Sequence, residues 1–177
     1  MLKALLPEML TSKGRMGPQT FLKAVLVFAG ISSILGLLSL FNPVFVVLSA
    51  IIKYPLLVLF VFILIRRSHD GNKNGFYCIL WLIIWGVIGG LINNFTMSLF
   101  NEALFSEVTR ELVAAFQSDD ETQMLAFIEE YVPLIQKNFG VPLALVGFIG
   151  TMLTAYIINL IVKQTPGDNK YGPLNTL

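Results

Sequence analysis

Four long runs of apolar residues alternate with short polar segments along the chain. They cover residues 21–41, 44–65, 76–97 and 140–162. Each run supplies the roughly 20 apolar residues with which a helix crosses the ~30 Å hydrocarbon core of a bilayer. None shows the strict alternation of a half-exposed strand, and a helix satisfies its own backbone hydrogen bonds in lipid. The pattern therefore predicts an all-α, polytopic membrane protein with four transmembrane helices.

The segment 98–139, between the third and fourth runs, has the pattern of amphipathic helices. Its apolar residues recur at intervals of three and four; they are Phe100, Leu104, Phe105, Val108, Leu112, Val113 and Phe116, then Met124, Leu125, Phe127, Ile128, Tyr131, Val132 and Ile135. Ser118 and Glu121 have the spacing of a capping box, and Pro133 is expected to kink or end the second helix. We predict an extracytoplasmic helical hairpin at 98–139, inserted in a single membrane domain that covers 1–177. Its apolar stripes either pack against each other and the bundle or form a face for a partner.

Short signals indicate where the helices begin and how they touch. Pro43 suits a helix start, and Asn138 is predicted to cap the fourth helix with Pro142 in its first turn. Tyr77 and Trp81 are expected at the membrane interface. Small residues spaced four apart, and asparagines inside the runs, are expected to make contacts between helices; these are Gly86 with Gly90, Ser32 with Gly36, Gly147 with Thr151, and Asn93, Asn94 and Asn159.

Composition supports the membrane interpretation. Of the 177 residues, 55% are hydrophobic and 13% are charged, about half the charged fraction of ordinary soluble domains. The single cysteine, Cys78, excludes an intrachain disulfide and a multi-cysteine metal site, so we expect it to serve packing. The apolar run that begins near Phe21 lacks a convincing cleavage site after it, and we interpret it as an uncleaved transmembrane helix.

The charges are segregated along the chain, and this predicts an orientation. Nine of the twelve basic residues lie in the N-terminal part, in the segment after the second run and in the C-terminal tail. The segment 98–139 carries eight of the eleven acidic residues and only two basic ones. Basic segments stay on the cytoplasmic side. Both termini are therefore predicted to be cytoplasmic and the acidic hairpin to face outward.

The polar segment 66–76, RRSHDGNKNGF, separates the second run from the third. Arg66 and Arg67 are expected to end the second helix at the inner headgroups, and Asp70 lies three residues from Arg67 and can pair with it. His69 has an ordinary pKa close to neutrality. Two interpretations follow: the arginines hold a lipid phosphate, or the charged groups pair with each other and with the C-terminal tail and fix the helix ends.

Three motifs resemble those of a bacterial inner-membrane family catalogued as domain of unknown function 805. They are GRMGPQTF at 14–21, with Gly14 and Arg15; the segment 66–76, with Arg66, Arg67, His69, Asp70 and Gly75; and GDNKYGP at 167–173, with Asn169, Tyr171, Gly172 and Pro173. Ser68, Asn74 and Phe76 depart from the family pattern, and the hairpin resembles an insertion. The resemblance implies a location in the bacterial inner (cytoplasmic) membrane, but it brings no assigned activity.

Lys53 is a charged residue inside the second run. It lies 13 residues before Arg66, which is about 20 Å along a helix, and Pro55 beside it suggests a kink. Its amine either snorkels to the outer interface or makes a buried polar contact that marks a functional site.

The sequence contains no recognisable enzyme motif and indicates no metal or other cofactor. We expect a small non-enzymatic accessory or scaffold subunit that acts through protein or lipid contacts, with the bilayer, a larger membrane complex or further copies of itself as partners. The alternative is a small homo-oligomeric transporter or channel, in which Lys53 and the intramembrane asparagines line a path. Nothing indicates binding to nucleic acid.

Overall fold

The computed structural model describes residues 9–41, 43–118 and 120–173. Its four principal helices are α2 (Pro18–Leu38), α3 (Pro43–Asp70), α4 (Tyr77–Gln117) and α5 (Glu121–Ile161). Outside them the described residues form an isolated β-bridge between Asn169 and Gly172, and no strand. All four helices are long and apolar enough to cross a membrane. The prediction of an all-α chain with four such helices is thus confirmed.

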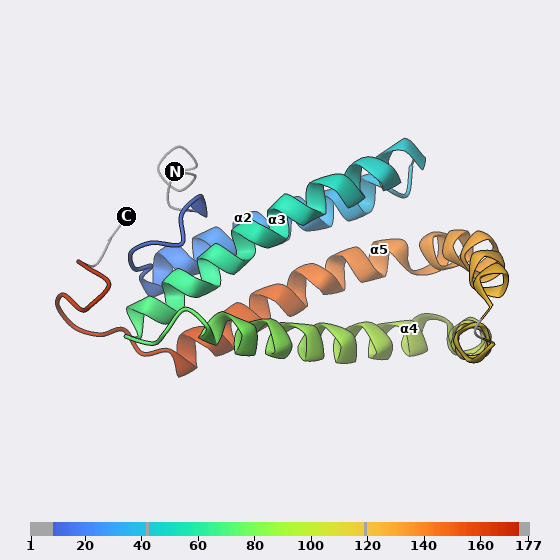
Figure 1. The fold of residues 1–177 in the computed structure, drawn as a ribbon. Coiled ribbons are helices and arrows are strands. Elements are labelled where there is room, and N and C mark those ends of the chain that lie inside the picture. The colour runs from blue at the N-terminus through green and yellow to red at the C-terminus, as the bar shows by residue number, and fades with distance from the viewer. Residues whose placement is uncertain (1–8, 42, 119, 174–177) are drawn as a thin grey trace.

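The helices form two antiparallel pairs, α2 with α3 and α4 with α5 (Figure 1). Helix α5 also packs against α2, and α3 also packs against α4. The start of α2, the end of α3 and the tail after α5 lie together at one end of the bundle, and the two pairs diverge toward the other end (Figure 1). The buried core cluster therefore lies toward the end of the bundle that holds the start of α2 and the end of α3.

Aromatic side chains fill the core between the pairs. The rings of Phe28 and Phe60 stack with centroids 4.4 Å apart, and Trp85 lies 5.3 Å from Phe60 at a tilt. Offset and tilted ring pairs are the arrangements that aromatic quadrupoles favour. Cys78 is buried in the same core, which agrees with the packing role expected for it.

Two helix boundaries differ from those predicted. Helix α3 does not stop before Arg66 but continues to Asp70, because those polar side chains have partners within the protein. Helix α5 is continuous through Pro133 and Pro142. Asn138 therefore caps no helix, and its side-chain amide donates to the Leu134 carbonyl within α5.

Helix α4 kinks at Asn101 and continues to Gln117. Asn101 has non-helical backbone angles, φ −161° and ψ 82°, and its side-chain oxygen accepts a hydrogen bond of 3.0 Å from the Leu104 amide. That bond is the N-cap interaction of a new helix. The helical hairpin expected at 98–139 is thus formed by the distal part of α4 and the first part of α5.

The turn of the hairpin is capped differently from the prediction. Ser118 ends α4, and Asp120 rather than Ser118 is the N-cap of α5. The Asp120 carboxylate accepts hydrogen bonds from the Thr122 hydroxyl and the Thr122 amide. These bonds hold the pKa of Asp120 below its usual value, because they stabilise the ionised carboxylate.

The apolar stripes of the hairpin are only partly covered. Val108, Ala115 and Tyr131 are buried between the two helices, and the Tyr131 hydroxyl lies 3.4 Å from a Glu107 carboxylate oxygen. Other apolar side chains of the hairpin are exposed; they are Phe100, Val113, Phe116, Leu125 and Ile128. Packing thus covers most of the predicted stripes fully or in part and leaves five of their fourteen apolar residues exposed.

The expected small-residue contacts are found at some positions and not at others. A Cβ added at Gly36 would touch Ala144 of α5, whereas Gly86 and Gly90 face open space. Asn159 donates to the Pro18 carbonyl across the α5–α2 contact. The pair Gly86/Gly90 therefore marks no helix contact in this bundle.

Candidate functional site

A cluster of polar side chains closes the end of the bundle where α2 begins and α3 and α5 end. We call it the polar cluster; its side chains are Arg15, Arg66, Arg67, His69, Asp70, Asn169 and Tyr171. They come from the segment before α2, the last turns of α3 and the tail after α5. The structure thus brings together three motifs that lie far apart in the sequence.

Asp70 is the centre of the polar cluster. One of its carboxylate oxygens accepts from Arg15 Nη2 at 3.0 Å and Arg15 Nε at 3.2 Å. The other oxygen accepts from Arg67 Nη1 at 2.5 Å. All three side chains are fully buried. A buried carboxylate is stable only when it is paired and hydrogen-bonded, and two arginines supply this here.

Backbone carbonyls of the C-terminal tail complete the coordination of the two arginines. Arg15 donates to the carbonyls of Thr165, at 2.6 Å, Gly167 and Gly172. Arg67 donates to the carbonyl of Val162, the residue that caps α5. The C-terminal end of a helix carries partial negative charge, so a cation is favoured there. These bonds hold the tail against the end of α3.

His69 connects the first motif with the last. Its ring stacks on Tyr171 with centroids 3.8 Å apart, and its Nδ1 lies 3.1 Å from the Gly14 carbonyl. The Asn169 side-chain amide donates to the His69 carbonyl at 2.9 Å. Gly75 is closely approached, because a Cβ there would come within 3.3 Å of His69 Nε2.

Three glycines of the motifs have backbone angles that favour glycine. Gly14 has φ +82°, Gly167 has φ +66° and Gly172 has φ +106°, a region that other residues adopt only with strain. Gly14 directs its carbonyl to His69, and Gly172 closes the turn that begins at Asn169. Pro173 is exposed and makes no hydrogen bond among the described residues.

Trp81 and Ser68 belong to the same region, but the sequence analysis did not assign them to it. Trp81 is buried rather than interfacial, and its indole nitrogen donates to the Ser68 hydroxyl at 2.9 Å. The Ser68 hydroxyl in turn donates to the Leu64 carbonyl. Tyr77, by contrast, is exposed. The burial of Trp81 could have been inferred from its position, about one helical turn into α4 and across from the end of α3.

The geometry of the polar cluster favours anchoring over phosphate binding. Arg15, Arg66 and Arg67 are 0–1% exposed. Arg66 donates to the Arg15 carbonyl at 2.9 Å, and the Arg67 guanidinium lies 5.9 Å from the Phe21 ring centroid. Across the described residues, no three His, Cys, Asp or Glu side chains are grouped closely enough to hold a metal ion. The cluster is thus built to hold backbone in place.

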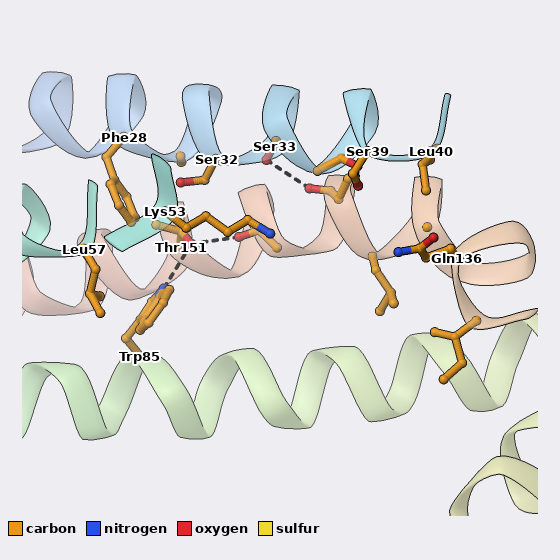
Figure 2. A pocket seen from close by; sticks show the side chains of 17 residues that line it. Phe28, Ser32, Ser33, Ser39, Leu40, Lys53, Leu57, Trp85, Gln136 and Thr151 are labelled. Carbon is orange, nitrogen blue, oxygen red and sulfur yellow. Dashed lines mark hydrogen bonds between the residues drawn. The ribbon is translucent and has the colours of Figure 1, made fainter. Parts of the chain in front are cut away.

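A cavity of about 550 Å³ lies between the four helices, on the side of the bundle away from the polar cluster. Lys53 of α3 extends into it, near Trp85 of α4 and Thr151 of α5 (Figure 2). Trp85 donates to the Thr151 hydroxyl, which itself donates to the Gly147 carbonyl. The structure therefore places Lys53 in a cavity about 25 Å from Asp70 along α3, and the two candidate sites are separate.

Comparison of the chain with protein-family models, with curated proteins and with solved structures finds no match.

Proposed function

We propose that this protein is a small multi-pass membrane protein that acts as an accessory or scaffold subunit, through contacts with protein or lipid. The observation that carries the proposal is the set of exposed apolar side chains on the hairpin, which includes Val113, Phe116 and Leu125 on a segment rich in acidic residues. Contiguous apolar side chains outside the bilayer are typical of a surface that another protein covers.

The orientation belongs to the same proposal. The tails and the end of α3 carry most of the basic residues, and the hairpin carries most of the acidic ones. Basic segments remain in the cytoplasm, so the polar cluster lies at the cytoplasmic face and the hairpin outside. Membership of the domain of unknown function 805 family, and with it a bacterial inner membrane, is supported by the contact that the three resembling motifs make in the polar cluster.

Purification from native membranes in mild detergent tests whether the protein binds a partner protein or further copies of itself. We expect the protein to elute with a partner or as an oligomer, and Phe116→Glu to release it, because that exposed side chain would no longer be apolar. Thr109→Glu is the matched control on a polar exposed position of the same helix. Elution of the unaltered protein as a bare monomer would count against the proposal.

A second candidate function is transport by a homo-oligomer. It is favoured by the cavity beside Lys53, since a charged residue inside a membrane bundle often marks a path for a solute or ion. Solute flux into proteoliposomes that is lost in Lys53→Met would support it over the accessory role.

A further inference from the structure

The cavity between the helices has the size and the walls of a ligand site. Its volume of about 550 Å³ falls within the roughly 300–1,000 Å³ typical of small-molecule pockets. Phe28, Leu57 and Trp85 form the apolar end nearest the polar cluster (Figure 2). Helices of both antiparallel pairs contribute to the walls, so the cavity follows from the divergence of the two pairs.

Lys53 is an ammonium group without a counter-charge in this cavity. No hydrogen bond or ion pair joins it to any of the described residues, and no aspartate or glutamate lines the cavity. The neighbouring hydroxyls of Ser33 and Thr151 already donate to backbone carbonyls. Lys53 is exposed, so a bound molecule can reach its ammonium group. A positive charge without a counter-charge among mostly apolar walls is complementary to an anion.

Polar and apolar surfaces meet at Lys53. A second cavity of about 330 Å³ shares Lys53, Ser39 and Gln136 with the first and is also lined by Ser49 and Tyr54. The larger cavity continues from this junction to its aromatic end. A molecule that matches both surfaces has one charged head and an apolar body.

We propose that the cavity binds one long-chain carboxylate, with the carboxylate at Lys53 and the hydrocarbon chain in the larger cavity. That cavity equals about 18 water volumes of ~30 Å³, and a methylene group is slightly smaller than a water molecule. The cavity itself therefore has room for about one hydrocarbon chain, and the second chain of a diacyl lipid would lie outside it. The inference rests on insertion of the four helices in a membrane and is independent of the hairpin's partner.

Trp85 provides a direct readout, because bromine atoms on a bound chain quench a tryptophan that they touch. The full-length protein in a neutral detergent is titrated with a dibrominated stearic acid. We expect saturable quenching, with an apparent affinity about tenfold weaker in Lys53→Met. Lys53→Arg retains binding, and the uncharged methyl ester of the same probe gives no saturable quenching.

Three controls separate this result from other causes. Trp85→Phe removes most of the saturable signal, since the remaining Trp81 does not line the cavity and donates to Ser68 instead. Lys23→Met, which removes a lysine of α2 outside the cavity lining, leaves the affinity unchanged. Thermal unfolding of each variant establishes that it is folded.

Two outcomes would overturn the proposal. Equal affinity of the unaltered protein and Lys53→Met would show that the lysine does not recognise the head group. Saturable quenching by a dibrominated phosphatidylglycerol, without any by the fatty acid, would assign the cavity to a diacyl lipid instead. Neither outcome bears on whether a partner co-purifies through the hairpin.

Discussion

Asp70 is the one carboxylate that joins the two buried arginines Arg15 and Arg67 in the polar cluster. It pairs with Arg15 from the segment before α2 and with Arg67 from its own helix, and its backbone carbonyl accepts from the Thr165 amide at 3.0 Å. Loss of one member of a buried ion pair is far more damaging than the pair is stabilising, because the partner's charge is left without compensation. The stability of this end of the bundle therefore depends on one carboxylate.

Asp70→Asn is expected to lower the free energy of unfolding by about 3–5 kcal/mol, the range for a broken buried pair. The amide keeps the shape of the side chain but removes the charge that the two guanidinium groups face. Denaturant titration in detergent, followed by circular dichroism, measures the change.

Glu111→Gln is the matched control for this substitution. Glu111 pairs with Arg110 at 3.0 Å, but the two side chains are 39% and 73% exposed, and exposed pairs contribute little. We expect no measurable change. Similar losses in both variants would mean that Asp70 has no special role.

Asn101 determines the shape of the longest elements. Its non-helical backbone breaks α4 into a membrane-length part and a distal part, and its side chain caps the second part. Without this break α4 would run straight from Tyr77 to Gln117, which is about 60 Å of helix, twice the thickness of a hydrocarbon core. The kink thus places the acidic hairpin across the end of the bundle rather than beyond it.

Asn101→Ala is expected to destabilise the distal part of α4 by about 1 kcal/mol, the usual cost of a lost N-cap. Amide hydrogen exchange should become faster at residues 102–107, while the polar cluster keeps its protection. Asn101→Asp retains a capping oxygen and serves as the control. If the alanine and aspartate variants exchange alike, the cap does not hold the kink.

The helices were largely predictable, because an apolar run of membrane length is a local property of the sequence. The residues at which the helices end were not predictable, because they depend on distant contacts. Helix α3 passes Arg66 only because Arg15 and the tail, far away in the chain, satisfy its polar side chains. Likewise Pro133 was expected to kink or end a helix and Pro142 to lie in the first turn of another, yet α5 is continuous through both.

At the scale of the whole molecule, the sequence predicted most residues of the polar cluster but not how they contact one another. The pair Arg67–Asp70 follows from a spacing of three residues. Spacing does not reveal that Arg15 would join this pair, or that the Trp81 side chain would point inward to Ser68.

The direction in which the Lys53 side chain points could not be predicted either, because the rotation of a helix about its axis is set by the helices that pack against it. Sequence alone left snorkelling and burial as alternatives.

The proposed orientation predicts which surfaces face the outside of the cell. In a Cys78→Ser background, Gln123→Cys in the hairpin and Asp168→Cys in the tail each provide one exposed thiol position. A membrane-impermeant maleimide applied to intact cells should label the hairpin variant, and should label the tail variant only after permeabilisation. Labelling of both variants from the same side would reject the orientation.

The bonds of Arg15 to the tail have a consequence for biosynthesis. Arg15 donates to the carbonyl of Thr165, which lies 150 positions later in the chain. Arg67 donates to the carbonyl of Val162, which lies 95 positions after Arg67. At about 5–20 residues per second, a ribosome needs roughly 5–20 s to make the stretch between Asp70 and Thr165. Throughout that interval Arg15 and Arg67 of the nascent chain can pair with Asp70, but their backbone acceptors after α5 do not yet exist. The polar cluster is therefore completed only after the segment that follows α5 has been made and has reached Arg15 and Arg67.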